Sequence, residues 1–217
     1  KLILKSFAEG IHLLSINQSH KNFTIFRLGK NTINISLFKN KSYVFTEDFN
    51  FGFNLIIKDI SKLCSLTIEE VENFMKEIDL KNILENNNES CLEKKYFYIS
   101  PYRKIKFQLI SDIISARMEE LFEICYKKNS NIKNLKNNDK IYINVEVSEY
   151  YKNVQYIITN SKLTVEECIL NNNTEQSLLS GVYGASELIG KGWEKEAVPI
   201  TLKKKSLISN LFSRLFS

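Results

Sequence analysis

The chain has 217 residues, of which 43% are hydrophobic and 25% are charged. This composition is that of an ordinary globular protein, and it excludes a wholly disordered chain. The length suffices for one large domain or two small ones. No apolar run reaches the about 18 residues that span a bilayer, and the first residues lack the plan of a signal peptide. Because the chain opens with Lys1, we expect a fragment of a longer protein, cut inside a folded region.

The net charge of +5 is mild for this length. Basic residues do not alternate with aromatic ones along any one face, so the sequence predicts no nucleic-acid binding. The cysteines are widely spaced and form no CxxC pair, which predicts reduced thiols. The histidines have no acidic or cysteine companions at ligand spacing, so no metal site is predicted. These residues are Cys64, Cys91, Cys125, Cys168, His12 and His20.

The first quarter of the chain predicts one helix followed by three strands. Apolar residues recur at helical spacing in residues 4–16. Residues 22–28 favour a strand, and residues 32–38 alternate strictly between apolar and polar side chains. A short turn leads into a third strand at 43–46. Three consecutive strands with short connections predict an antiparallel meander.

The middle of the chain is predicted to be mainly helical. Residues 54–64 are periodic, and Thr67–Glu70 has the signature of a capping box that opens another helix. A polar loop is expected at 85–95, a strand at 96–99, and the longest helix at 105–128.

The last third returns to mixed structure. An asparagine-rich loop is predicted at 129–139, followed by strands at 141–145 and 155–159. A short helix is expected at 177–190, and a linker that contains a proline at 191–205.

Residues 206–217 divide cleanly into an apolar and a polar half when wound as a helix, directly behind three lysines. The apolar half is large and partly aromatic, and the polar half contains no acid. This pattern is typical of a helix that lies in a membrane surface, although docking on the chain's own core remains an alternative. The predicted membrane-binding residues are Lys203, Lys204, Lys205, Leu207, Ile208, Leu211, Phe212, Arg214, Leu215 and Phe216.

Four short sequence signatures occur one after another before the amphipathic end of the chain. They lie at residues 6–11, 28–32, 51–61 and 113–121. The run 51–61 is similar to a Gly-Gly-x-x-[IT]-x-x-Asp-[IL]-Ala motif, and 113–121 is similar to Ile-Ile-x-x-Arg-x-x-Glu. In this order they resemble the second half of the FtsA family of bacterial cell-division proteins.

The resemblance implies an α/β fold: an actin-like (ribonuclease H-like) half with an inserted smaller α/β subdomain and a C-terminal amphipathic helix. The core would comprise 1–50 and 140–190, and the smaller subdomain 51–139. The linker 191–205 would then lead to the membrane-targeting helix 206–217.

The nucleotide site that the resemblance implies is altered here. Its glycine-rich hairpin should carry an Asp that holds hydrated Mg²⁺, but Arg27 stands there, and only Gly29 and Thr32 remain. The Gly-Gly turn that normally receives adenosine after a late strand is also missing, because the strands predicted at 141–145 and 155–159 contain no glycine. The first phosphate motif would lie before the start of the chain. We therefore expect Gly29 to be an ordinary turn glycine, and we expect that the chain does not bind ATP with Mg²⁺. If a nucleotide did bind, Gly29, Thr32 and Arg117 would be its contacts.

No catalytic arrangement is predicted either. Asp59 and Glu72 fall on helix faces beside lysines, and no nucleophile, base and orienting group come together. Glu119, Glu120 and Glu123 are typical of a solvated helix face. The sequence therefore predicts no enzyme.

The resemblance further implies a peripheral anchor that links FtsZ polymers to anionic membrane lipids, at the cytoplasmic face of the inner membrane and at the division site. It also implies self-association into actin-like filaments. The smaller subdomain would bind the acidic, partly apolar C-terminal peptide of FtsZ, although its basic loop could also be merely solvated. Alternatives are an actin-like ATPase of the pilus-assembly or rod-shape type and a plain interaction domain. The candidate partner-binding residues are Tyr98, Tyr102, Arg103, Lys104, Lys106 and Phe107.

Overall fold

The centre of the molecule is a five-stranded sheet with the order β3-β2-β1-β4-β5. The structure is a computed structural model. It describes residues 4–17, 19, 21–86, 89–129, 132, 140–147, 150–160, 168–170 and 174–191. The strands are β1 (Phe23–Leu28), β2 (Ile33–Lys39), β3 (Ser42–Phe49), β4 (Lys140–Val145) and β5 (Cys168–Leu170).

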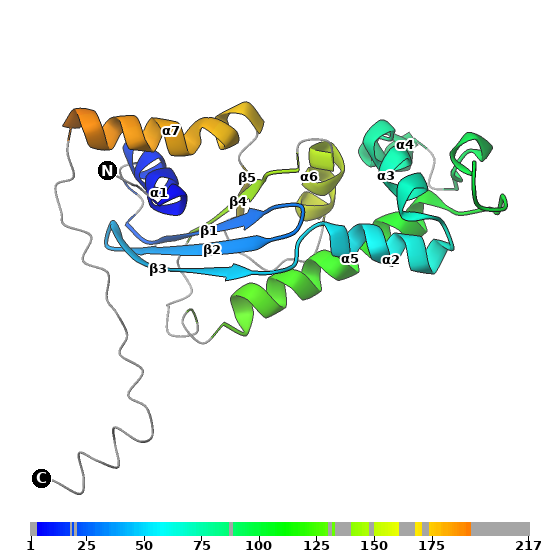
Figure 1. Cartoon of the computed structure of the whole chain (residues 1–217), viewed down its shortest axis with the longest axis horizontal. Coiled ribbons are helices and arrows are strands. Elements are labelled where there is room, and N and C mark those ends of the chain that lie inside the picture. The colour runs from blue at the N-terminus through cyan, green and yellow to red at the C-terminus, as the bar shows by residue number, and fades with distance from the viewer. Residues whose placement is uncertain are drawn as a thin grey trace, which may run out of the picture.

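The first three strands form an antiparallel meander, and β4 and β5 extend the sheet in parallel from the other side of β1. The meander and the later strands thus join in one sheet, although a long helical segment separates them in the sequence (Figure 1). The parallel pairing of β1 with β4 brings the ends of these two strands together, next to the turn that leads into β2.

Helices cover both faces of the sheet (Figure 1). On one face lie α1 (Lys5–Ile16) and α7 (Thr174–Lys191), and on the other face lie α2 (Asn54–Cys64) and α5 (Phe107–Phe122). A π-helical turn, η2 (Glu123–Lys127), continues α5. The remaining helices are α3 (Ile68–Glu77), α4 (Leu80–Asn86), the 3₁₀ turn η1 (Lys94–Tyr96) and α6 (Tyr151–Asn160).

All six residues of β1 are buried, because the strand lies at the centre of the sheet with helices on both sides. Phe23 and Ile25 pack with Leu13 and Leu14 of α1 in the smaller apolar cluster. Phe26 belongs to the larger cluster, which continues into the helices of the inserted segment. A strand buried on both faces is expected to be apolar throughout, so the buried Thr24 and Arg27 are exceptions.

The two helices on the first face approach each other at a glycine. A Cβ atom added to Gly184 of α7 would lie 1.7 Å from the backbone carbonyl oxygen of Ala8 in α1. The two backbones are therefore in direct contact, and no side chain fits between them.

We predict that Gly184→Ala lowers the free energy of unfolding by about 1–3 kcal/mol, because the added methyl group forces the two helices apart. Gly190→Ala is the matched control in the same helix, since a Cβ there meets nothing within 4 Å. It should leave stability unchanged or raise it by about 0.5–1 kcal/mol through the loss of a helical glycine. Urea unfolding of both variants is the measurement, and equal stabilities would contradict the close contact.

Most predicted elements are confirmed. The helices expected at 4–16, 54–64 and 105–128 are present, and so are the meander strands and the strand at 141–145. The helix expected at 177–190 is also present, as part of α7. The capping box is confirmed, because the Thr67 side chain accepts a hydrogen bond from the Glu70 amide while the Glu70 carboxylate accepts one from the Thr67 amide.

The strand predicted at 155–159 is wrong, because these residues lie in α6. Val154, Ile157 and Ile158 are buried, and their spacing places them on one face of a helix. Asn153 also favours this helix: its side-chain amide donates to the carbonyls of Met75 and Ile78, and its oxygen accepts from the Leu80 amide. The short elements α4 and β5 were not predicted.

The strand predicted at 96–99 is also wrong, because η1 ends at Tyr96 and bends follow it. The amide of Ile99 donates to the carboxylate of Glu70 and not to a neighbouring strand. Within 51–139, the described residues contain only an isolated β-bridge between Cys91 and Lys106. Apart from this bridge, the regular structure that is described in the inserted segment is therefore helical, and not the α/β mixture expected.

The predicted linker beyond Lys191 and the predicted membrane-targeting helix at 206–217 lie outside the described residues. Among the helices that are described, none is both long enough and apolar enough to cross a membrane.

Candidate functional site

The turn between β1 and β2 is a tight hairpin that the start of α2 supports. The Gly29 amide donates to the carbonyl of Thr32 at 2.9 Å. The carbonyls of Gly29 and Lys30 accept hydrogen bonds from the amides of Phe53 and Asn54 at 3.0 and 2.9 Å. Gly52 allows this approach, because a Cβ atom there would lie 2.4 Å from the Gly29 carbonyl oxygen. The structure thus brings the predicted pair Gly29 and Thr32 together in a fixed hairpin.

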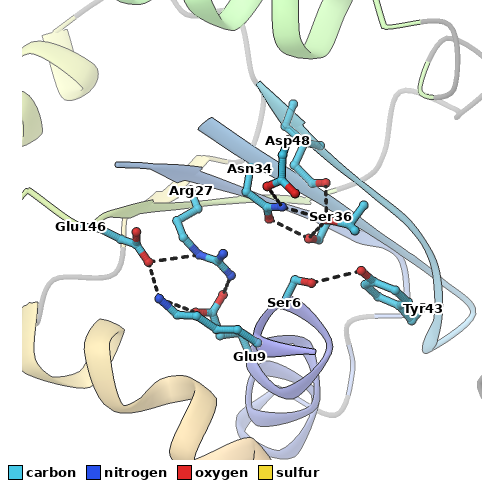
Figure 2. A network of polar contacts seen from close by, with 11 residues as sticks. Ser6, Glu9, Arg27, Asn34, Ser36, Tyr43, Asp48 and Glu146 are labelled. Carbon is cyan, nitrogen blue, oxygen red and sulfur yellow. Dashed lines mark hydrogen bonds and ion pairs between the residues drawn. The ribbon is translucent and has the colours of Figure 1, made fainter. Parts of the chain in front are cut away.

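Arg27, two residues before this hairpin, lies between two carboxylates (Figure 2). One guanidinium nitrogen donates to Glu9 of α1, and Nε lies 3.3 Å from Oε1 of Glu146, which directly follows β4. Lys5 completes the group, with its Nζ 2.5 Å from the same Glu146 oxygen and 3.9 Å from Glu9. We call these four residues the charge cluster.

The charge cluster is deepest at Glu9, whose side chain is 1% exposed. Burial raises the pKa of Glu9 above its ordinary value, although the charge and hydrogen bond of Arg27 and the charge of Lys5 act in the opposite direction. A buried carboxylate of this kind requires a partner. Arg27 supplies it, and so the two charges hold α1 against the sheet.

A polar row continues from Arg27 across the meander. Asn34 is the cross-strand neighbour of Arg27 on β2, and Asp48 is the neighbour of Asn34 on β3. The Asn34 amide group donates to Asp48 at 2.7 Å and to Thr46 at 2.8 Å, and Ser36 donates to the Asn34 oxygen (Figure 2). These side chains satisfy one another's hydrogen bonds on the same face of the sheet as Arg27.

This arrangement does not fit the magnesium nucleotide that the family resemblance implies. Mg²⁺ requires oxygen ligands, and a guanidinium cannot supply one. The nearby carboxylates, Glu9 and Glu146, are instead paired with Arg27 and Lys5. No group of three or more acidic, histidine or cysteine side chains in the described part of the chain could hold a metal ion.

The third predicted nucleotide contact, Arg117, is bound elsewhere. Its guanidinium donates to Asp59 of α2 and to Glu120 in its own helix. Asp59 therefore serves to join α2 to α5. Glu72 of α3 pairs with Lys30 of the hairpin at 3.2 Å.

The predicted partner-binding residues lie at the far end of the inserted segment, and the buried Glu70 holds their loop. Its carboxylate accepts hydrogen bonds from the amides of Ile99 and Ser100, both at 2.8 Å, and from the Ser100 hydroxyl at 2.6 Å. Burial alone would raise the pKa of Glu70, but the hydrogen bonds from Ser100, Thr67 and Ile99 outweigh it and lower the pKa to about 2.

The loop that Glu70 holds presents large apolar side chains to solvent. Tyr98, Ile99 and Tyr102 are 50%, 59% and 48% exposed. Tyr98 accepts a hydrogen bond from Asn73 at 2.6 Å, and Tyr102 packs edge-on against Phe97, with ring centroids 5.1 Å apart. Two further apolar side chains, Leu63 and Ile68, are exposed beside the turn between α2 and α3, and Arg103 and Lys104 are exposed on the loop. We call the exposed loop residues Tyr98, Ile99, Tyr102, Arg103 and Lys104 the tip surface.

Two of the predicted residues lie outside the tip surface. Phe107 does not contribute to an exposed surface, because its ring is buried at the start of α5. Lys106 precedes it and pairs with Glu89 at 2.5 Å. Ile99 was missed, because an exposed apolar residue and a core residue look alike in the sequence.

We predict that Glu70→Gln destabilises the protein at neutral pH by about 1.5–3 kcal/mol, because hydrogen bonds to a charged acceptor are lost. Since the pKa of Glu70 is lowered from 4.5 to about 2, its contribution is present above pH 4.5 and is lost as the pH falls toward 2. The stability difference between wild type and variant should therefore shrink over this pH range.

Urea unfolding at several pH values within that range measures this effect. Glu119→Gln, at an exposed position of α5, is the control and should show no such trend. A difference between wild type and Glu70→Gln that does not change with pH would contradict the assignment.

Comparison with known proteins identifies the fold of the chain. No protein-family model matches the chain, and no curated protein matches its sequence. Among solved structures, the ethanolamine utilization protein EutJ from Carboxydothermus hydrogenoformans is similar at 12% identity with a TM-score of 0.51, over 82% of this chain and 52% of that one. ParM from Bacillus thuringiensis, solved with ATP, is similar at 14% identity with a TM-score of 0.50, over 80% and 48%.

The chain spans about half the length of these two structures. At such low identity the likeness concerns the fold alone. The expected actin-like, ribonuclease H-like α/β fold is confirmed, whereas the C-terminal amphipathic helix of the same expectation lies outside the described residues.

Proposed function

We propose that this protein is a non-enzymatic, actin-fold adaptor that binds the C-terminal peptide of FtsZ and attaches FtsZ polymers to the cytoplasmic face of the inner membrane at the division site. The observation that carries the proposal is the tip surface, in which a buried carboxylate fixes a loop whose aromatic and aliphatic side chains remain exposed. Exposed apolar residues that gather on an ordered loop are typical of a protein-binding site.

The charge of the tip surface suits an acidic peptide with apolar residues. Arg103 and Lys104 are exposed beside Tyr102. Tyrosine and arginine contribute strongly to binding energy at protein interfaces, and the basic side chains would attract an acidic peptide. The loop is already held by Glu70, so binding would cost little ordering entropy.

We predict that Tyr102→Ala combined with Arg103→Glu weakens binding of a labelled FtsZ C-terminal peptide by about tenfold or more, since one apolar anchor and one attractive charge are lost. Fluorescence anisotropy with the full chain is the measurement. Lys81→Glu, which makes the same charge change at an exposed position on α4, should leave the affinity nearly unchanged. Equal affinities of the double variant and the wild type would contradict the proposed site.

The membrane attachment rests on the sequence of residues 206–217. Six large apolar side chains could each contribute about 1.5–3 kcal/mol at full burial. Partial immersion and the ordering of the segment reduce this sum, while each nearby lysine adds about 1 kcal/mol at an anionic surface. One copy should therefore bind weakly, and several copies held together by self-association should bind strongly.

We predict that removal of Leu207–Ser217 abolishes binding to vesicles of anionic phospholipid, because the apolar half of the segment is lost. Circular dichroism should show that the fold is retained. Cosedimentation of the full chain and the truncated chain is the measurement, with Ser209→Ala on the polar half as the control that should still bind. A truncated chain that sediments with vesicles as well as the full chain does would rule out the anchor.

The second candidate is an actin-like ATPase of the pilus-assembly or rod-shape type. The well-formed hairpin at Gly29 and Thr32 favours it, and the pairing of Arg27 with Glu9 and Glu146 argues against it. Tight binding of Mg-ATP in a titration would decide for the ATPase.

A further inference from the structure

Glu146 is held beside the hairpin by the sheet itself. Its backbone amide donates to the carbonyl of Leu28 at 2.9 Å, which continues the parallel pairing of β1 with β4 by one more residue. Leu28 immediately precedes Gly29. The backbone position of Glu146 is therefore as fixed as that of the two central strands.

The carboxylate of Glu146 lies beside Gly29, at the distance of an ordinary van der Waals contact from where a side chain would begin. A Cβ atom added to Gly29 would lie 3.5 Å from Oε2 of Glu146 and 3.0 Å from the carbonyl oxygen of Thr32. The Gly29 amide donates to the Thr32 carbonyl, so Glu146 adjoins the hairpin without accepting from that amide. The anion next to this hairpin is therefore a side chain of the protein itself, the carboxylate of Glu146.

The other carboxylate oxygen of Glu146 binds the cations of the charge cluster. Oε1 lies 2.5 Å from Lys5 Nζ and 3.3 Å from Arg27 Nε, and Arg27 in turn donates to Glu9 (Figure 2). Two positive and two negative side chains thus balance one another. They come from α1, from β1 and from the end of β4, so the cluster joins three elements.

We propose that Glu146 is an internal anion that lies beside the hairpin, pairs with Lys5 and Arg27 in place of an external phosphate group and, with Glu9, locks α1 to the sheet. The chain then holds by itself the conformation that a bound anion would otherwise stabilise. A phosphate group could approach the hairpin only after displacing Glu146 from both Lys5 and Arg27.

The proposal implies that an anion site appears when Glu146 is removed. In Glu146→Ala, Lys5 loses its closest partner, Arg27 keeps only Glu9, and the space above Gly29 opens. We expect inorganic pyrophosphate to raise the thermal midpoint of this variant in a saturable way and to leave the midpoint of the wild-type chain unchanged. Without pyrophosphate, the variant should melt below the wild type.

Differential scanning fluorimetry of the full chain, with isothermal titration of pyrophosphate, is the measurement. Glu119→Ala, which removes the same charge from an exposed position on α5, should behave as the wild type does. Adding Lys5→Ala to Glu146→Ala should weaken pyrophosphate binding by about tenfold or more, since one of the two cations is then missing.

Pyrophosphate binding to the wild type as tight as to Glu146→Ala would overturn the proposal. A folded Glu146→Ala chain that does not bind pyrophosphate would overturn it too. If Glu146→Ala does not fold, Glu146→Ser also removes the charge and most of the side chain; a folded Ser variant without any response to pyrophosphate would equally contradict the internal anion. Binding to vesicles and to the FtsZ peptide is tested separately, so either proposal can fail alone.

Discussion

The ion pair between Arg27 and Glu9 is the interaction on which the arrangement of the sheet and its first helix depends. Both side chains are removed from water, and such a pair is favourable only when each charge keeps its partner. The loss of one partner would leave an uncompensated charge between α1 and the central strand. Because α7 in turn contacts the backbone of α1 at Ala8, a disturbance of the pair would reach both helices on this face.

The charge cluster and the tip surface use carboxylates in opposite ways. Glu9 and Glu146 are paired with the cations Arg27 and Lys5, so the charges beside the hairpin are already balanced within the chain. Glu70 is instead surrounded by backbone amides and hydroxyls, so it shapes a loop and leaves the apolar side chains of that loop exposed. The first arrangement argues against a ligand at the hairpin, and the second supports a partner at the tip.

The sequence predicts the elements of this fold well where one local pattern dominates. The helix at 54–64 follows Gly52 and has a clear apolar period, and its predicted bounds agree with α2. The segments 96–99 and 155–159 were misassigned because aromatic and β-branched residues favour strands locally. In both segments tertiary contacts decide the structure: Glu70 accepts a hydrogen bond from the Ile99 amide of the first, and burial of one helical face orders the second.

The candidate site was predictable only in part. The replacement of an acid by Arg27 is visible in the sequence, but its partners Glu9 and Glu146 become neighbours only when α1 and β4 pack on β1. Likewise, the capping box identifies Glu70 as a helix-start residue and gives no sign that the same carboxylate also binds a distant loop. Local motifs therefore locate these residues without revealing their second role.

The double use of Glu70 has a consequence for how this protein can diverge in sequence. One carboxylate caps α3 and also fixes the loop that carries Tyr98 and Tyr102. A substitution at Glu70 would alter that loop although Glu70 itself is buried beneath the surface that a partner would contact. The start of α3 and the exposed loop thus share one carboxylate, so a single substitution there would disturb both.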